Sequence, residues 1–224
     1  MVTIILVIAA VAAALFVEPS SYQPTPPDRP ASASQPAAGS ASAALALLEV
    51  KGRAPKTDYR RTAFGDGWAM VGMCDTRNII LHRDMPDALV SDNCKVMRGT
   101  LHDPYTGTTI AFSRGADTSD AIQIDHVVAL SDAWQKGAAA LTPATRQTLA
   151  NDPLELLAVD GPANQAKGDG DAATWLPPNK SFRCAYVARQ IAVKAKYGLW
   201  ITPAERDAMR AILATCPGQA LPTP

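Results

Sequence analysis

The sequence predicts an α+β fold in which a β-ribbon region is followed by a strand–strand–helix unit and then by a C-terminal helical hairpin. Strand-like runs separated by turn residues occupy 95 to 113. Two short apolar runs, 122 to 128 and 154 to 159, precede a helix that begins at Pro162. From 181 onward the pattern is helical twice in succession. The chain has 224 residues, 47% of them hydrophobic, which fits one medium domain with accessory segments.

The first 17 residues are typical of a targeting segment. Val2 to Val17 is apolar except for Thr3, and this run is shorter than the roughly 20 residues that a membrane span needs. Its length suits the apolar region of a signal peptide. No Lys or Arg precedes it and no clean small-x-small cleavage site follows Phe16, so retention as a membrane anchor is the alternative. Under both interpretations the folded domain is exported, and it is either secreted or anchored to the cell envelope.

Residues 18–43 are dominated by Pro, Ala and Ser. Such a segment cannot bury enough apolar surface to offset the entropy lost on ordering, so a disordered linker is predicted. A short helix is expected within 44–50. The predicted folded domain spans 44–216, and residues 217–224 form a C-terminal tail.

The elements of the folded domain follow from local signals. Strands are expected at 95–101 and 108–113, because the turn residues of 103–107 lie between them. The strand at 122–128 places Ile122 and Ile124 on one face, and Gln123 and Asp125 on the other. A helix is expected at 131–140, and a second one after Thr142, which caps it.

The C-terminal hairpin is predicted from helix-ending and helix-capping residues. The first helix runs from Ser181 to Tyr197, and Gly198 ends it. Thr202 and Glu205 have the spacing of a capping box, so a second helix runs from there to about 215.

The four cysteines allow three pairings and form no CxxC motif. Cys74 with Cys94, and Cys184 with Cys216, are the expected pairs, because each pair lies within one local unit and antiparallel helices bring the second pair together. Disulfides agree with an exported protein. Free buried thiols are the alternative.

Basic residues are unevenly distributed although the formal net charge is zero. Zero net charge argues against a strongly basic nucleic-acid coat. Residues 51–61 carry five basic residues against Asp58, and residues 172–204 carry five basic residues and no acid. Such stretches either follow the phosphates of a nucleic acid or are solvated helix faces.

Two polar clusters provide the candidate chemistry. Asp125 and His126 lie at the end of the apolar strand, and Asn164, Lys167 and Asp169 follow on the predicted helix and its end. Together they supply a base, oxygen ligands for a hard cation and a phosphate contact. This combination is typical of metal-assisted phosphodiester hydrolysis.

The motifs Asp-His-Val-Val-Ala-Leu-Ser at 125–131 and Asn-Gln-Ala-Lys-Gly-Asp at 164–169 resemble those of the HNH endonucleases, the ββα-metal nucleases. The chain looks closest to their secreted actinobacterial branch, and the similarity covers 70–216. The resemblance implies a ββα-metal (HNH-like) core formed by the two strands and the helix, and a single Mg²⁺ (or Mn²⁺) ion. It implies His126 as general base, with Asp125 and Asn164 as metal ligands. A structural histidine, a surface carboxylate and a helix-start hydrogen bond are the respective alternatives.

Two further residues are candidate contacts to the substrate phosphates. Lys167 could contact a phosphate next to the scissile one, and a solvated helix lysine is the alternative. Arg77 could also grip a phosphate, and a structural ion pair with Asp75 is the alternative.

Glu155 departs from the family pattern, because an asparagine usually stands there on the second strand. Asparagine both donates and accepts hydrogen bonds, whereas an ionised glutamate only accepts. We therefore expect a less firmly held His126 loop and reduced activity.

The function predicted from the sequence is an exported, metal-dependent endonuclease that acts as a monomer on DNA, with RNA left open as a further substrate. The alternative is a non-catalytic or weakened nucleic-acid-binding protein on the same scaffold, tethered to the envelope through 2–17.

Overall fold

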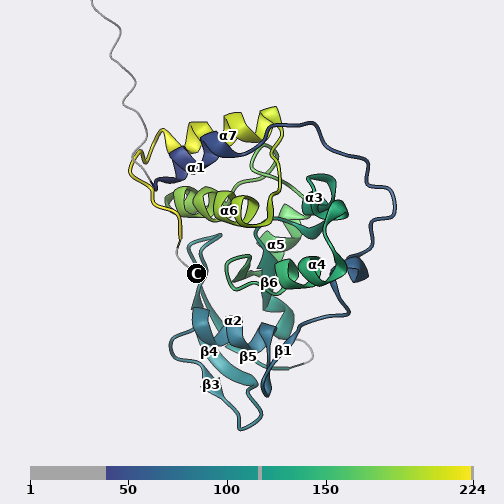
Figure 1. The fold of residues 1–224 in the computed structure, drawn as a ribbon. Helices are drawn as coiled ribbons and strands as arrows, with labels where there is room; N and C mark the ends of the chain where they lie inside the picture. Colours follow the sequence, from purple (N-terminus) through teal and green to yellow (C-terminus); the bar gives the residue numbers. More distant parts are fainter. Residues whose placement is uncertain (1–38, 116–117, 223–224) are drawn as a thin grey trace, which may run out of the picture. The chain divides into compact units, whose positions relative to one another are not determined.

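The computed structural model describes residues 39–115 and 118–222 (Figure 1). The predicted leader at 1–17, and residues 18–38 of the predicted linker, lie outside these ranges. Among the helices of the described ranges, none combines the length and apolar character that a membrane crossing requires.

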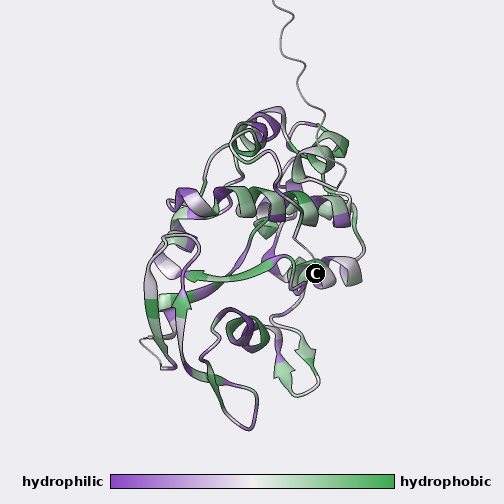
Figure 2. Ribbon diagram, turned by 90° about the vertical axis from the view of Figure 1, so that its left-hand side faces the viewer, coloured by the Kyte–Doolittle hydropathy of each residue, from purple (hydrophilic) through white to green (hydrophobic). Residues whose placement is uncertain are grey.

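Three helices, α1 (Ala41–Leu47), α6 (Arg183–Tyr197) and α7 (Pro203–Leu213), pack against one another (Figure 1). Gly198 ends α6 in the left-handed conformation, and Thr202 with Glu205 forms the predicted capping box of α7. The disulfide between Cys184 and Cys216 joins the far ends of this hairpin, as predicted. Hydrophobic and hydrophilic residues interleave along the helices (Figure 2), as expected where each buries one face.

Helix α1 begins inside the range predicted as linker. Ser40 caps it by accepting a hydrogen bond from the backbone N–H of Ala43. Ala41 and Leu45 are buried in the main hydrophobic cluster, so burial stabilises a segment whose composition alone suggests disorder. The C-terminal tail also packs, since Ala41 donates to the carbonyl of Gln219.

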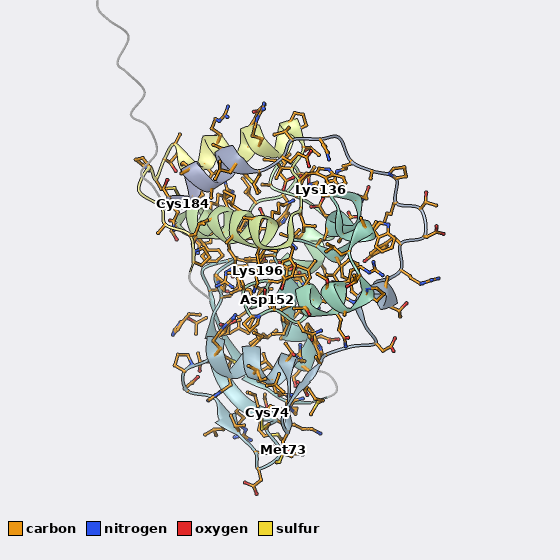
Figure 3. The ribbon with its side chains drawn as sticks, viewed as in Figure 1. Met73, Cys74, Lys136, Asp152, Cys184 and Lys196 are labelled. Atoms are coloured by element: carbon orange, nitrogen blue, oxygen red, sulfur yellow. A yellow bond between two sulfur atoms is a disulfide. The ribbon has the colours of Figure 1, made fainter. Side chains whose placement is uncertain are left out.

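The β-ribbon region contains more elements than the sequence predicts. The predicted strands are β4 (Val96–His102) and β5 (Thr109–Ser113), and β3 (Leu89–Val90) pairs with β4 to give an antiparallel sheet of order β3-β4-β5. The unpredicted elements are α2 (Thr76–Asp84) and the short hairpin β1 (Met70–Val71) and β2 (Cys74–Asp75). The predicted disulfide between Cys74, labelled in Figure 3, and Cys94 ties this hairpin to the loop before β4.

The centre of the domain is an antiparallel pair, β6 (Ile122–His126) and β7 (Leu156–Asp160), followed directly by α5 (Gly161–Lys167). Asp125 pairs with Leu157, and His126 pairs with Leu156. A Cβ atom at position 161 would lie 2.2 Å from the carbonyl oxygen of Asp120. Glycine there allows α5 to start tight against the chain that enters β6.

The β6–β7 pair separates two hydrophobic clusters. Ile122 and Ile124 pack with residues of α2 and β4, whereas Leu157 and Val159 face the cluster formed by the helices. Gln123 and Asp125 pair with Val159 and Leu157, so adjacent residues of β6 point to opposite sides, as the predicted alternation requires.

Several predicted boundaries differ from the structure by a few residues, and two of the differences have a clear local cause. β6 stops at His126 because the next backbone N–H groups bond to one residue, Val127 to the carbonyl of Glu155 and Val128 to its side chain. Helix α3 (Leu130–Gln135) stops before the predicted end at 140, because Gly137 takes a φ of +121°. The helix after Thr142 is α4 (Pro143–Ala150), as predicted.

A buried cluster of charges holds these parts together. Lys136, labelled in Figure 3, is fully buried and lies 2.6–2.8 Å from carboxylate oxygens of Asp132, Asp171 and Glu205. Burial alone would lower the pKa of Lys136, but the neighbouring carboxylates outweigh it and raise the pKa. The cluster connects α3 and α7 to the loop that follows α5.

Candidate functional site

One cavity of about 230 Å³ brings together the predicted base and the two predicted metal ligands. Asp125 and His126 reach it from β6, and Asn164 reaches it from α5. Asp169, Ser131 and Arg61 complete its polar wall. The convergence that the two sequence motifs predict is therefore present in the fold.

His126 is held on two sides. Its Nε2 lies 2.9 Å from the carbonyl oxygen of Ala150, at the end of α4. Because a carbonyl only accepts, Nε2 carries the hydrogen and Nδ1 keeps a free lone pair. The indole of Trp68 stacks on the imidazole with an interplanar angle of 5° and ring centroids 5.7 Å apart. These contacts fix the ring in the tautomer and orientation that a base requires.

Burial lowers the pKa of His126 to about 3, and the charges of Arg61 and Lys167 act in the same direction. The ring is therefore neutral at physiological pH and can accept a proton. Negative charge brought close to the ring would raise this pKa and make the imidazole a stronger base.

Both carboxylate oxygens of Asp125 have partners. The hydroxyl of Tyr105 donates to Oδ2, and Nζ of Lys167 lies 2.9 Å from Oδ1. Burial raises the pKa of Asp125, and the ammonium of Lys167 opposes that rise. Each oxygen keeps a further lone pair.

The side chain of Lys167 points into the protein and contacts other residues of the site. Its side chain is fully buried, and its ammonium also donates to the carbonyl of His126 at 2.7 Å. The lysine thereby ties α5 to the end of β6. The ammonium contacts Asp125 and the carbonyl of His126, both within the protein. The phosphate contact predicted for Lys167 stays a prediction.

Arg77 lies on α2 and is not among the residues that line the cavity. Its guanidinium donates to the carbonyls of Ser119 and Ile122, at the opposite end of β6 from His126. Asp75, the predicted partner, instead caps α2 through the backbone N–H of Asn78. The structure does not bring Arg77 together with the other predicted site residues, and its phosphate contact stays a prediction.

The oxygen atoms of the cavity suit a hydrated hard cation. The amide nitrogen of Asn164 donates to Oε1 of Gln123 at 2.9 Å, which leaves the amide oxygen for a ligand. With Asp125 this gives one carboxylate and one amide oxygen, a set that fits Mg²⁺ or Mn²⁺ with several waters. Within 39–115 and 118–222, no group of three or more His, Cys, Asp or Glu side chains could hold a metal ion.

Glu155 lies beside the His126 loop, and the structure adds that its side chain is buried, which the sequence alone does not show. It is fully buried, Oε2 lies 3.3 Å from the backbone nitrogen of Val128, and Oε1 has no partner among the described residues. Burial raises the pKa of Glu155 well above 4.5. A neutral carboxylic acid donates as well as accepts, as an asparagine does. Burial therefore favours the protonated acid over the ionised form that the sequence suggests, and the charge state of Glu155 stays a prediction.

Sequence reasoning missed Tyr105, Trp68 and the carbonyl of Ala150, because each reaches the site through tertiary packing. The sequence pointed to Arg61 only as one of the five basic residues of the stretch 51–61. Its side chain lines the cavity, and its guanidinium forms no salt bridge or hydrogen bond with the residues that the structure describes.

Residues 82–212 match the family model described as "GmrSD restriction endonucleases, C-terminal domain". A protein of Arthroderma benhamiae is 38% identical over 195 residues, which cover 86% of this chain and 90% of the relative. That relative is described as an "Uncharacterized secreted protein". The match to the family model includes both polar motifs and begins after Arg61 and Trp68.

Proposed function

Because the chain belongs to the family of GmrSD restriction endonuclease C-terminal domains, we propose that it is an exported, metal-dependent endonuclease that hydrolyses phosphodiester bonds in DNA. RNA remains open as a second substrate. The family indicates a nuclease. The two disulfides, and the name of the relative, support action outside the cytoplasm.

A single observation carries this proposal: an imidazole with a free Nδ1 shares a small cavity with an Asp and an Asn oxygen. In the proposed reaction Nδ1 of His126 takes a proton from the attacking water, and the carbonyl of Ala150 keeps the ring oriented. Asp125 and Asn164 would hold one Mg²⁺ or Mn²⁺ ion, which supplies Lewis-acid stabilisation of the phosphate and the leaving oxygen when bound. Lys167 and Tyr105 hold the Asp125 carboxylate in place.

The environment of Glu155 bears on the alternative function, a weakened binding protein. An ionised glutamate, which cannot donate to the His126 loop, favours that alternative. Burial raises the pKa of Glu155 and favours the protonated acid, which weakens this argument against catalysis.

The test is cleavage of plasmid DNA, single-stranded DNA and RNA by the purified protein, in Mg²⁺, in Mn²⁺ and in EDTA. We expect cleavage in either metal and none in EDTA. His126→Ala should lower the rate about 10²- to 10⁴-fold, the usual contribution of a general base. His82→Ala is the matched control, because His82 is exposed on α2 and lies outside the cavity.

Two outcomes contradict the proposal. Full activity of His126→Ala would show that another group is the base. Tight nucleic-acid binding without turnover in either metal would instead support the binding protein.

A further inference from the structure

A second cavity, of about 250 Å³, lies next to the first and shares His126, Arg61 and Leu130 with it. Its remaining wall comes from Thr62, Phe64 and Trp68, together with the turn 65–67 and Ala150. We call it the aromatic cavity. Its own wall adds the aromatic rings of Phe64 and Trp68, whereas the first cavity adds the carboxylate, amide and hydroxyl groups of Asp125, Asn164 and Ser131. The guanidinium of Arg61, which has no hydrogen-bond or salt-bridge partner among the described residues, borders both.

Size and chemistry limit the occupant of the aromatic cavity. Its volume is slightly below the roughly 300 Å³ at which drug-sized ligand sites begin, so one flat ring system fits better than a longer molecule. Aromatic walls attract a planar, polarisable ring by stacking. Arg61, at the boundary of the two cavities, suits a phosphate attached to that ring.

The segment that forms this wall is held in place before any ligand binds. Phe64 and Tyr59 pack against Trp134 with ring centroids 6.3 and 6.0 Å apart. Nε of Arg146 donates to the carbonyl of Ala63 at 2.8 Å, and Nε1 of Trp134 donates to the carbonyl of Thr57. A preformed wall costs little ordering entropy when a ligand enters.

We propose that the aromatic cavity takes one unpaired nucleobase of the strand being cleaved, next to the scissile phosphate, with Arg61 on the intervening phosphate. The proposal rests on the proposed function for its substrate. A base inside a duplex cannot enter such a cavity without unstacking. The protein should therefore prefer single-stranded or locally unpaired nucleic acid.

The test uses a series of single-stranded oligonucleotides in which one abasic residue is moved stepwise through the cleaved sequence. Cleavage is measured in Mg²⁺, and binding to the wild-type protein is measured in EDTA by fluorescence anisotropy. One abasic position should lower kcat/KM, and weaken binding, by about 5- to 150-fold, the range that stacking of one base supplies. Abasic residues at other positions should have smaller effects.

Two pairs of variants locate the effect. Thr62→Trp fills the aromatic cavity and should remove the abasic penalty, whereas Thr57→Trp adds the same ring at an exposed position outside both cavities and should keep it. Arg61→Ala should weaken binding and reduce the slope of log K against log salt by about one, and Arg60→Ala should do so less.

Equal penalties at every abasic position, with cleavage intact, would overturn the proposed base site and leave the proposed nuclease function standing. A position-specific penalty in binding, without cleavage in any metal, would support the base site and overturn the nuclease. A penalty that persists in Thr62→Trp would also overturn the assignment to this cavity.

Discussion

Replacement of Glu155 by glutamine offers a quantitative test of the environment around the His126 loop. Glu155 is fully buried in the low-dielectric interior, and one of its carboxyl oxygens has no hydrogen-bond partner among the described residues. Burial raises its pKa well above 4.5, so we expect the folded protein to keep, over some range of pH above 4.5, a proton that the unfolded chain releases. Glutamine has a similar shape and does not ionise.

The sign and size of the effect follow from proton linkage. Above pH 4.5 the unfolded wild type binds fewer protons than the folded wild type at this site, so its stability falls as pH rises. Relative to Glu155→Gln, the free energy of unfolding of the wild type should fall by about 1.4 kcal/mol per pH unit until the pKa in the folded protein is reached. Below pH 4.5 the two proteins should differ by about 1 kcal/mol or less, since both side chains are neutral.

The assay is urea unfolding of both proteins at intervals from pH 4 to 8, with the disulfides intact. Taking the difference between the two proteins cancels the titration of groups that they share. Glu49→Gln is the control, because Glu49 forms an exposed ion pair with Lys51. It reports how much an exposed glutamate contributes to the pH dependence of the free energy of unfolding. A difference that stays flat from pH 5 to 8 would mean that Glu155 is ionised in the fold, and the account of its neutral form would be refuted.

Three further predictions concern the charge cluster, the base and the helical hairpin. Lys136→Met leaves buried carboxylates undercompensated, so urea unfolding should show a loss of about 3–5 kcal/mol, against less than about 1 kcal/mol for Lys56→Met at an exposed pair. The imidazole NMR signals of His126 should keep their neutral-form shifts from pH 7 to about 4, because its pKa is lowered to about 3; an inflection near pH 6.5 would contradict this. Replacing Cys184 and Cys216 with alanine should cost about 3–4 kcal/mol, given the 32-residue separation, and an unchanged urea midpoint would argue against that cross-link.

Local signals were sufficient for much of the fold and for the central motif residues. The periodicity of 122–128, the capping pair Thr202 and Glu205, and the terminator Gly198 act within one or two turns of chain, so the corresponding elements form as predicted. The two disulfides follow from the same local units. The two polar motifs, with their resemblance to the HNH endonucleases, predict that Asp125 and His126 meet Asn164 of the helix after β7, and the three line one cavity.

Long-range packing decided the rest. Helix α1 is ordered by burial against α6 and α7 despite a linker-like composition. Lys167 forms a salt bridge with Asp125 because α5 packs back against β6. The position of α5 depends in turn on the register of β6 and β7. The raised pKa of Glu155 and the lowered pKa of His126 arise from desolvation, which depends on every element packed around the two side chains and which no local pattern encodes. Trp68 and Arg61 reach the site from a segment about sixty residues before His126, so only the tertiary structure places them there.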